Sequence, residues 1–279
     1  MKKINYNKED DEQIEINHLK KYSRHMLILK VVLVILVFII ITLPLFFVIR
    51  FNLNKNITSK AINNVNEYKN VNNYLLQITE HNIDFERNTE SFHNSKYFYK
   101  DNQYKKEMHS ETPGVNIQNA DRFEYGNINS KEKVEIIETQ KVCYNVKANY
   151  ILQKKDGFLD FMMIALQPFS EDYGTLPNIW VQVGYNLRTD KYNGRKCYVL
   201  RLGDKSSYRE IWIDKEQNTL VRTVDEIYNR SYNEKVYSIK SDVVTNEDVT
   251  LPDLTGYTIK DSEDNVPSEY IGIYEKLGI

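Results

Sequence analysis

The pattern of hydrophobic and polar positions changes several times along the chain, and its first feature is a long uncharged run. Residues 31–49 carry no charge and are almost all aliphatic or aromatic. As a helix, this run of about 19 residues is roughly 30 Å long, which matches the hydrocarbon thickness of a bilayer. A core helix of that length would normally show a polar face. The pattern therefore predicts one transmembrane helix within residues 26–50.

Basic residues are concentrated on the N-terminal side of this run. Lys20, Lys21, Arg24 and Lys30 precede it, whereas Arg50 is followed only by widely spaced lysines. This bias predicts a cytoplasmic tail, residues 1–25, and an extracytoplasmic domain, residues 51–279. A cleaved signal peptide is the alternative, but the run is long and no small-x-small pattern follows it. We therefore expect an uncleaved signal anchor in a single-pass protein of the cell membrane.

Beyond the span, the apolar period is first helical and then changes to two. Ile57, Ala61, Val65 and Tyr68 recur every three or four positions, which predicts a helix over residues 57–69. Short Tyr-, Val- and Ile-rich runs bounded by turn-forming residues follow, as is typical of strands. The expected strands are residues 74–80, 96–100, 103–109, 122–125, 134–139 and 142–152.

The stretch 179–244 shows the most regular strand pattern. Residues 179–186 alternate in the manner of a strand, and Asn193-Gly194 is a strong signal for a type I′ hairpin turn. Polar turns then separate further runs at 196–202, 208–213, 219–228 and 235–243. Consecutive strands with short polar connections predict an antiparallel meander of five strands, with one face in water and the other covered.

A short apolar segment, residues 158–166, lies between the two groups of strands. It runs Phe-Leu-Asp-Phe-Met-Met-Ile-Ala-Leu, and Asp160 is its only polar residue. Methionine, leucine and alanine favour a helix, and a helix without a polar face is normally buried. The composition predicts a short helix, buried nearly all round, against the concave face of a curved sheet.

Three tracts resemble the family of the lipoprotein carrier LolA and the related periplasmic sensor domain of RseB. They are Asn-Gly-Arg-Lys-Cys-Tyr-Val-Leu-Arg-Leu at 193–202, Arg-Glu-Ile-Trp-Ile-Asp-Lys at 209–215, and Leu-Val-Arg at 220–222. The resemblance implies an α+β fold: a curved antiparallel β-sheet, or open half-barrel, covered by short helices, with an apolar cavity that receives acyl chains. This chain departs from the carrier by its membrane anchor.

Charge and motifs exclude several other functions. A net charge of −2 disfavours nucleic acid as a partner, since phosphate binding needs a concentrated basic surface. The spacing of His81, His93 and His109 matches no zinc motif, so no metal is expected. Ser130 and Lys133 match a bare Ser-x-x-Lys, but the surrounding stretch is hydrophilic and disfavours a desolvated lysine. We therefore expect no cofactor and no enzymatic activity.

Both cysteines, Cys143 and Cys197, fall in predicted strands of the outer domain. Outside the cytoplasm a disulfide could join them, which requires their strands to be neighbours. Two buried free thiols are the alternative, and the sequence leaves both open.

The candidate ligand-binding residues are the large apolar side chains of the short helix together with the two tryptophans: Phe158, Phe161, Met162, Met163, Trp180 and Trp212. In one interpretation they line an apolar cavity, and in the other they are core residues. The first hypothesis is a membrane-anchored extracytoplasmic domain that binds a lipid, lipoprotein or apolar ligand, as carrier or cell-envelope sensor. The alternative is a non-enzymatic structural or interaction module that binds another envelope protein.

Overall fold

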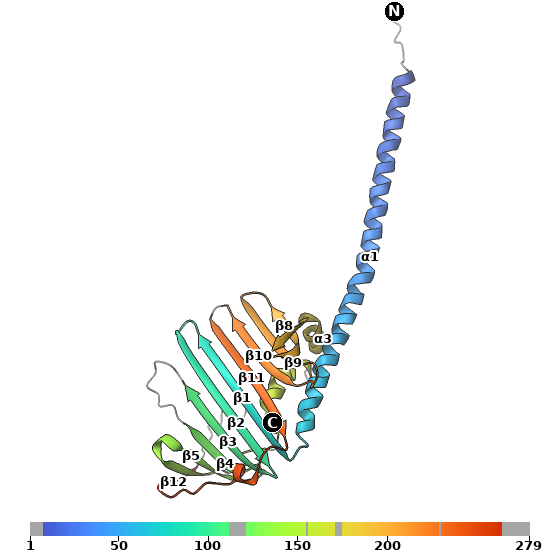
Figure 1. The fold of residues 1–279 in the computed structure, drawn as a ribbon. Coiled ribbons are helices and arrows are strands. Elements are labelled where there is room, and N and C mark those ends of the chain that lie inside the picture. The colour runs from blue at the N-terminus through green and yellow to red at the C-terminus, as the bar shows by residue number, and fades with distance from the viewer. Residues whose placement is uncertain (1–7, 112–120, 155, 171–174, 229, 264–279) are drawn as a thin grey trace, which may run out of the picture. The chain divides into compact units, whose positions relative to one another are not determined.

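The computed structural model describes residues 8–111, 121–154, 156–170, 175–228 and 230–263 (Figure 1). The chain divides into two compact units, Met1–Asn52 and Leu53–Ile279, which are considered separately below.

A single helix, α1 (Lys8–Tyr68), contains both the predicted span and the predicted helix at 57–69. The polar stretch between them holds no proline or glycine, so nothing in it interrupts helical hydrogen bonding. Within the described residues, one helix is long and apolar enough to cross a membrane, and none of its apolar window is buried in the protein. This exposure contradicts the interpretation of the run as a core helix.

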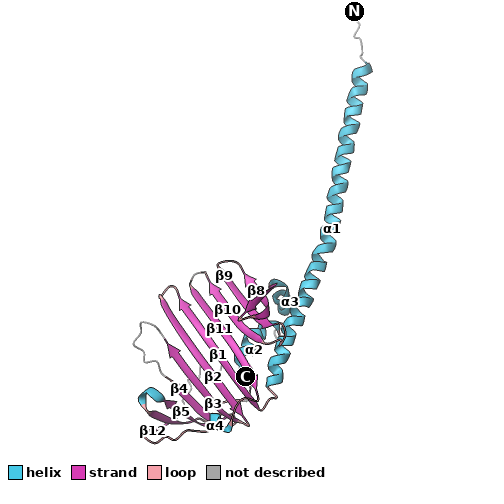
Figure 2. Ribbon diagram, viewed as in Figure 1, coloured by secondary structure: helices cyan, strands magenta, loops and turns pink. Residues whose placement is uncertain are grey.

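The second unit is built on a sheet of 12 strands (Figure 2). The strands of the first group are β1 (Asn73–Asp84), β2 (Thr89–Lys100), β3 (Gln103–Glu111), β4 (Arg122–Asn127), β5 (Glu132–Ile137) and β6 (Val142–Lys147). Those of the second group are β7 (Asn186–Tyr192), β8 (Arg195–Gly203), β9 (Ser207–Asp214), β10 (Leu220–Ile227), β11 (Ser231–Ser241) and β12 (Thr258–Glu263).

The strand order is β12-β6-β5-β4-β3-β2-β1-β11-β10-β9-β8-β7. The two sequence groups join where β1 pairs antiparallel with β11, with Leu76 opposite Ile239 and Ile78 opposite Tyr237. All strand pairs are antiparallel except β12 and β6. The expected open antiparallel sheet with few helices, behind one long apolar helix, is therefore confirmed.

One predicted strand is wrong. The first part of the stretch at 179–186 is a helix, α3 (Thr175–Gly184), and β7 begins only at Asn186. Ile179, Val181, Val183 and Tyr185 alternate with mostly polar or small residues, and this period of two favoured a strand. The decisive signal is Asn178 and Gln182, which lie four positions apart and are both buried on one side of the helix.

The hairpin turn is confirmed, and so is the meander of five strands, except that its first strand is β7 and not the predicted strand at 179–186. Asn193 and Gly194 both adopt positive φ angles, 48° and 80°, as a type I′ turn requires. The turn joins β7 to β8, so the five strands β7 to β11 follow one another in the sheet.

The main core lies on one face of the sheet, called here the helix-covered face. Buried tyrosines of β1, β2 and β3 (Tyr74, Tyr97, Tyr99 and Tyr104) pack there against Ile57, Ala61 and Val65 of α1. A short helix, α2 (Asp160–Leu166), and a 3₁₀ turn, η2 (Gln167–Phe169), complete this cover.

Smaller clusters lie on the opposite face. Tyr125, Ile136 and Cys143 pack there beneath Leu254 and Tyr257. This covering segment follows α4 (Asn246–Val249), a single turn that begins with a capping box between Thr245 and Asp248. A 3₁₀ turn, η1 (Glu138–Gln140), connects β5 to β6.

The cysteines are not bridged. Cys143 lies in β6 and Cys197 in β8, and eight strands separate these two in the sheet order. Both residues are buried free thiols, as the alternative interpretation held. A disulfide would need their Cα atoms within about 7 Å, which strands at opposite ends of a sheet cannot provide.

Candidate functional site

Helix α2 divides its apolar residues between the core and the surface. Met162 and Leu166 are completely buried, while Phe161 is 42% and Ile164 56% exposed. Phe158, just before the helix, is buried, and the centroid of its ring lies 4.9 Å from that of Tyr97. The segment at 158–166 is thus a helix against the sheet, as predicted, but it is not buried all round.

Helix α3 shows the same division. Its polar residues Asn178 and Gln182 are buried, whereas Ile179 is 39% and Trp180 74% exposed. Large apolar side chains on two consecutive helices are therefore in contact with water, and burying these side chains would be energetically favourable. These four exposed residues, Phe161, Ile164, Ile179 and Trp180, are called the α2–α3 apolar surface below.

Buried hydrogen bonds attach α3 to the part of α1 that belongs to the second unit. The side chain Nδ2 of Asn54 donates to the main-chain oxygens of Gln182 (2.5 Å) and Tyr185 (2.9 Å), at the C-terminal end of α3. In return, Nε2 of Gln182 donates to Oγ1 of Thr58 at 3.2 Å. Carbonyls at a helix end lack intrahelical partners, so Asn54 acts as a cap supplied by another helix. These contacts fix the position of α3 in the second unit.

The predicted ligand residues do not form one site. Phe158 and Met162 are core, and Met163 packs partly buried against that core. Phe161 and Trp180 belong to the α2–α3 apolar surface. Sequence reasoning missed the other two members of this surface, Ile164 and Ile179. The helical period could have found Ile164, because Phe161 and Ile164 fall on a different side of the helix from Met162 and Leu166.

Trp212 lies on the opposite face of the sheet. It packs with Cys197, Val199 and Val221, apart from the main core. Its Nε1 donates to Glu210 at 3.0 Å, and the guanidinium groups of Arg188 and Arg222 lie 5.3 and 5.0 Å from its ring. The polar atom of Trp212 therefore has a hydrogen-bond partner, and its ring lies beside two cations and the apolar residues of this smaller cluster.

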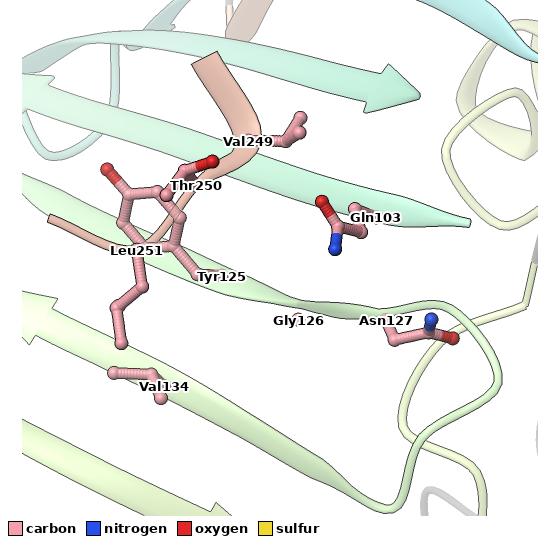
Figure 3. Close-up of a pocket in the computed structure, with 8 residues that line it drawn as sticks. All are labelled: Gln103, Tyr125, Gly126, Asn127, Val134, Val249, Thr250 and Leu251. Atoms are coloured by element: carbon pink, nitrogen blue, oxygen red, sulfur yellow. The ribbon is translucent and has the colours of Figure 1, made fainter. Parts of the chain in front are cut away.

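Two surface pockets lie away from all of these residues. One, of about 290 Å³, is lined by residues of β3, β4 and β5 and by Val249, Thr250 and Leu251 (Figure 3). The other, of about 180 Å³, is lined by residues of β2 and β3 with Asp121 and Phe123. Neither includes a predicted ligand residue, and both are smaller than is usual for small-molecule sites.

Lys133 is less hydrated than the sequence suggested. Its Nζ lies 3.0 Å from Glu124 and 2.7 Å from Glu135, and its side chain is only 11% exposed. Burial by itself lowers the pKa of Lys133, but the charges of the two glutamates outweigh burial, so the pKa is raised. A lysine held protonated cannot take a proton from Ser130, which argues against a Ser-Lys nucleophile by a different route.

The histidines have hydrogen-bonding roles. His109 lies between two carboxylates, with Nδ1 2.5 Å from Asp121 and Nε2 2.8 Å from Glu111. Hydrogen bonds to Glu111 and Asp121 raise the pKa of His109. In the part of the chain that the structure describes, no group of three or more His, Cys, Asp or Glu side chains is placed to hold a metal ion.

No family model matches the sequence, and no curated protein matches it. Among solved structures, the chain is similar to the lipoprotein LppX of Mycobacterium tuberculosis, with a TM-score of 0.36 and 10% identity over 71% of this chain and 99% of that one. A second similar structure is MucB in complex with MucA (TM-score 0.30, 11% identity, 71% of this chain), of which the chain covers 60%, less than two thirds of its length.

A third is an outer membrane lipoprotein-sorting protein domain from Vibrio parahaemolyticus, with a TM-score of 0.26 and 10% identity over 69% of this chain and 97% of that one. Likenesses this distant concern the fold alone, so function is argued from the residues of this chain.

Proposed function

We propose that this protein is a membrane-anchored extracytoplasmic domain that binds a lipid or another apolar ligand at the α2–α3 apolar surface. The observation that carries the proposal is the exposure of Phe161, Ile164, Ile179 and Trp180 on helices whose other faces are buried. Large apolar groups left exposed on two helices that both contact η2 favour a binding surface over an inert one. The orientation, with residues 1–25 cytoplasmic, follows from the positive charges before the span.

Binding on the surface is favoured over carriage in an interior cavity. Phe158, Leu159 and Met162 are at most 2% exposed and pack directly on the tyrosines of the sheet. The space that the resemblance assigns to acyl chains is occupied at these positions by side chains of the protein itself. The role of an envelope sensor therefore fits better than that of an internal carrier.

A protein partner with an apolar segment is the second candidate, and the same filled core supports it. It requires no interior space, and the same four side chains would serve as its contact.

Photo-crosslinking tests the proposal on the full chain held in amphipol, where no bilayer is present. A diazirine-bearing fatty acid, added below its micelle concentration, is activated and its adducts are mapped by mass spectrometry. We expect adducts concentrated in peptides covering 158–184, reduced about tenfold or more in the double variant Phe161→Ser, Trp180→Ser, because removal of two anchors removes most of the contact energy.

The control variant, Ile227→Ser with Val243→Ser, changes two side chains that are 50% and 47% exposed elsewhere on the domain. It should keep the wild-type adduct pattern. Adducts spread evenly over the domain, or unchanged in the Phe161 and Trp180 variant, would show that the α2–α3 apolar surface is not the binding site.

A further inference from the structure

We infer that the occupant of the α2–α3 apolar surface is the bilayer in which the chain's own helix is anchored. On this inference Phe161, Ile164, Ile179 and Trp180 insert into the interfacial layer of the membrane on the side of the second unit. The inference rests on the proposed function, since it names the ligand of the same surface, and the experiment below separates failure of one from failure of the other.

The first step is the covalent reach of the chain. Ile49 is the last residue of the uncharged run, and Asn54 follows five residues later. Even a fully extended chain of five residues spans only about 18 Å. Asn54 is therefore within about 18 Å of the end of the membrane span, whatever orientation the two units take.

The second step is that α3 is tied to this same residue. Asn54 donates hydrogen bonds to the main-chain oxygens of Gln182 and Tyr185, and all three residues are buried. Trp180 lies two residues before Gln182 on the same helix. Contacts within the second unit therefore hold the backbone around Trp180 close to Asn54, the residue whose distance from the span is limited by the chain.

The third step is the chemistry of the surface. Tryptophan is enriched at membrane interfaces, where its ring is partly buried in acyl chains and its N–H stays near the headgroups. Phenylalanine and isoleucine are typical of the apolar side of interfacial helices, which lies about 5–10 Å into the headgroup and acyl boundary. If the ligand were water-soluble, the same side chains would have to remain in contact with water at the membrane surface.

The charges of the two helices make the inference specific. Neither α2 (DFMMIAL) nor α3 (TLPNIWVQVG) contains a lysine or arginine, and Asp160 is their only charged residue. Attraction to anionic headgroups, which drives many interfacial helices, is therefore absent from these two helices. Insertion should depend on apolar contact alone and be insensitive to salt and to the fraction of anionic lipid.

Depth-dependent fluorescence quenching tests the inference with the full chain in phosphatidylcholine vesicles. The chain has only two tryptophans, and Trp212 is 5% exposed, so a lipid-borne quencher reports mainly on Trp180. A nitroxide at the 5-position of the acyl chain should quench at least a third of the emission, more than one at the 12-position. The variant Trp180→Phe should lose this quenching, and Ile227→Ser with Val243→Ser should keep it.

Vesicles with 30% phosphatidylglycerol, or with 0.5 M NaCl, should give the same quenching as neutral vesicles at low salt. The inference would be overturned if acrylamide quenched the emission of Trp180 fully and the lipid nitroxide did not quench it. If fatty-acid adducts at 158–184 nevertheless form in amphipol, the proposed function stands without the bilayer as ligand. If those adducts are also absent, both proposals fail.

Discussion

Environment separates the two tryptophans, although both were predicted to bind ligand. The Trp212 ring is buried and lies near two guanidinium groups, whereas Trp180 is 74% exposed. We expect Trp212→Ala to lower the free energy of unfolding by about 3–5 kcal/mol, as for other buried aromatic residues. Trp180→Ala should change it by less than about 0.5 kcal/mol. Urea unfolding of the full chain in amphipol, followed by circular dichroism, measures both, and equal losses would contradict the assignment of Trp212 to the interior.

The ion pair of Lys133 and Glu124 provides a second test at the residue scale. Glu124 is 4% exposed, accepts a hydrogen bond from Tyr104 at 2.7 Å, and has Lys133 as its cationic partner. Lys133→Met leaves a buried carboxylate without its cation, which should cost about 3–5 kcal/mol of unfolding free energy. Lys147→Met is the control, because its 3.7 Å pair with Glu132 is exposed on both sides and should contribute less than about 1 kcal/mol. Similar losses in the two variants would rule out a special role for the buried pair.

His109 should make stability weakly dependent on pH. Its pKa in the folded protein is raised above 6.5 by hydrogen bonds to Glu111 and Asp121. A raised histidine pKa stabilises the folded state fully below the unfolded value and loses this contribution as pH rises through the folded value. In the full chain, selective ¹³C labelling of histidine and an NMR titration should assign His109 a midpoint above 6.5. A midpoint at or below 6.5 would contradict the hydrogen bonding described here.

At the scale of elements, the sequence located most strands of the meander but predicted the segments at 158–166 and 179–186 less well. The strands of the meander could be located because β-branched and aromatic residues alternate between polar turns. The helix at 158–166 was correctly placed from its methionine and leucine content, yet its exposed side was not foreseen. In α3 the alternation of Ile179, Val181 and Val183 with other residues favoured a strand, although the segment is a helix. Burial of Asn178 and Gln182 on one side, toward other parts of the fold, selects the helix.

The cap that Asn54 supplies to α3 can be tested directly. Asn54→Ala removes both donors to the oxygens of Gln182 and Tyr185, and unpaired buried carbonyls cost about 1–3 kcal/mol. We expect faster hydrogen exchange in α3, including the amide of Tyr185, which bonds to the oxygen of Val181 at 3.2 Å. Asn63→Ala, at an exposed position of the same helix, should leave exchange unchanged. An α3 that exchanges normally in the Asn54 variant would show that the cap does not stabilise the helix.

At the scale of the whole molecule, strand order determines the chemistry of the cysteines. Cys143 and Cys197 lie toward opposite ends of the sheet, in β6 and β8. The intact mass of the full chain should therefore be identical with and without reductant. Both thiols should react with iodoacetamide only after unfolding in guanidinium, because both are fully buried. A mass lower by about 2 Da without reductant would mean that a disulfide forms after all.

The sequence by itself determined the local features: an uncharged run of bilayer length, a bias of basic residues before it, a hairpin turn at Asn193-Gly194 and a series of alternating strands. Each of these features can be predicted because it depends on only a few neighbouring residues. Tertiary structure alone decided which strands pair, that the interior near Phe158 is filled, and that Trp180 and Trp212 lie in unrelated environments. Pairing of β1 with β11 and the cap from Asn54 join residues more than a hundred positions apart. No local pattern encodes contacts at that separation, because they depend on how the whole apolar surface is buried at once.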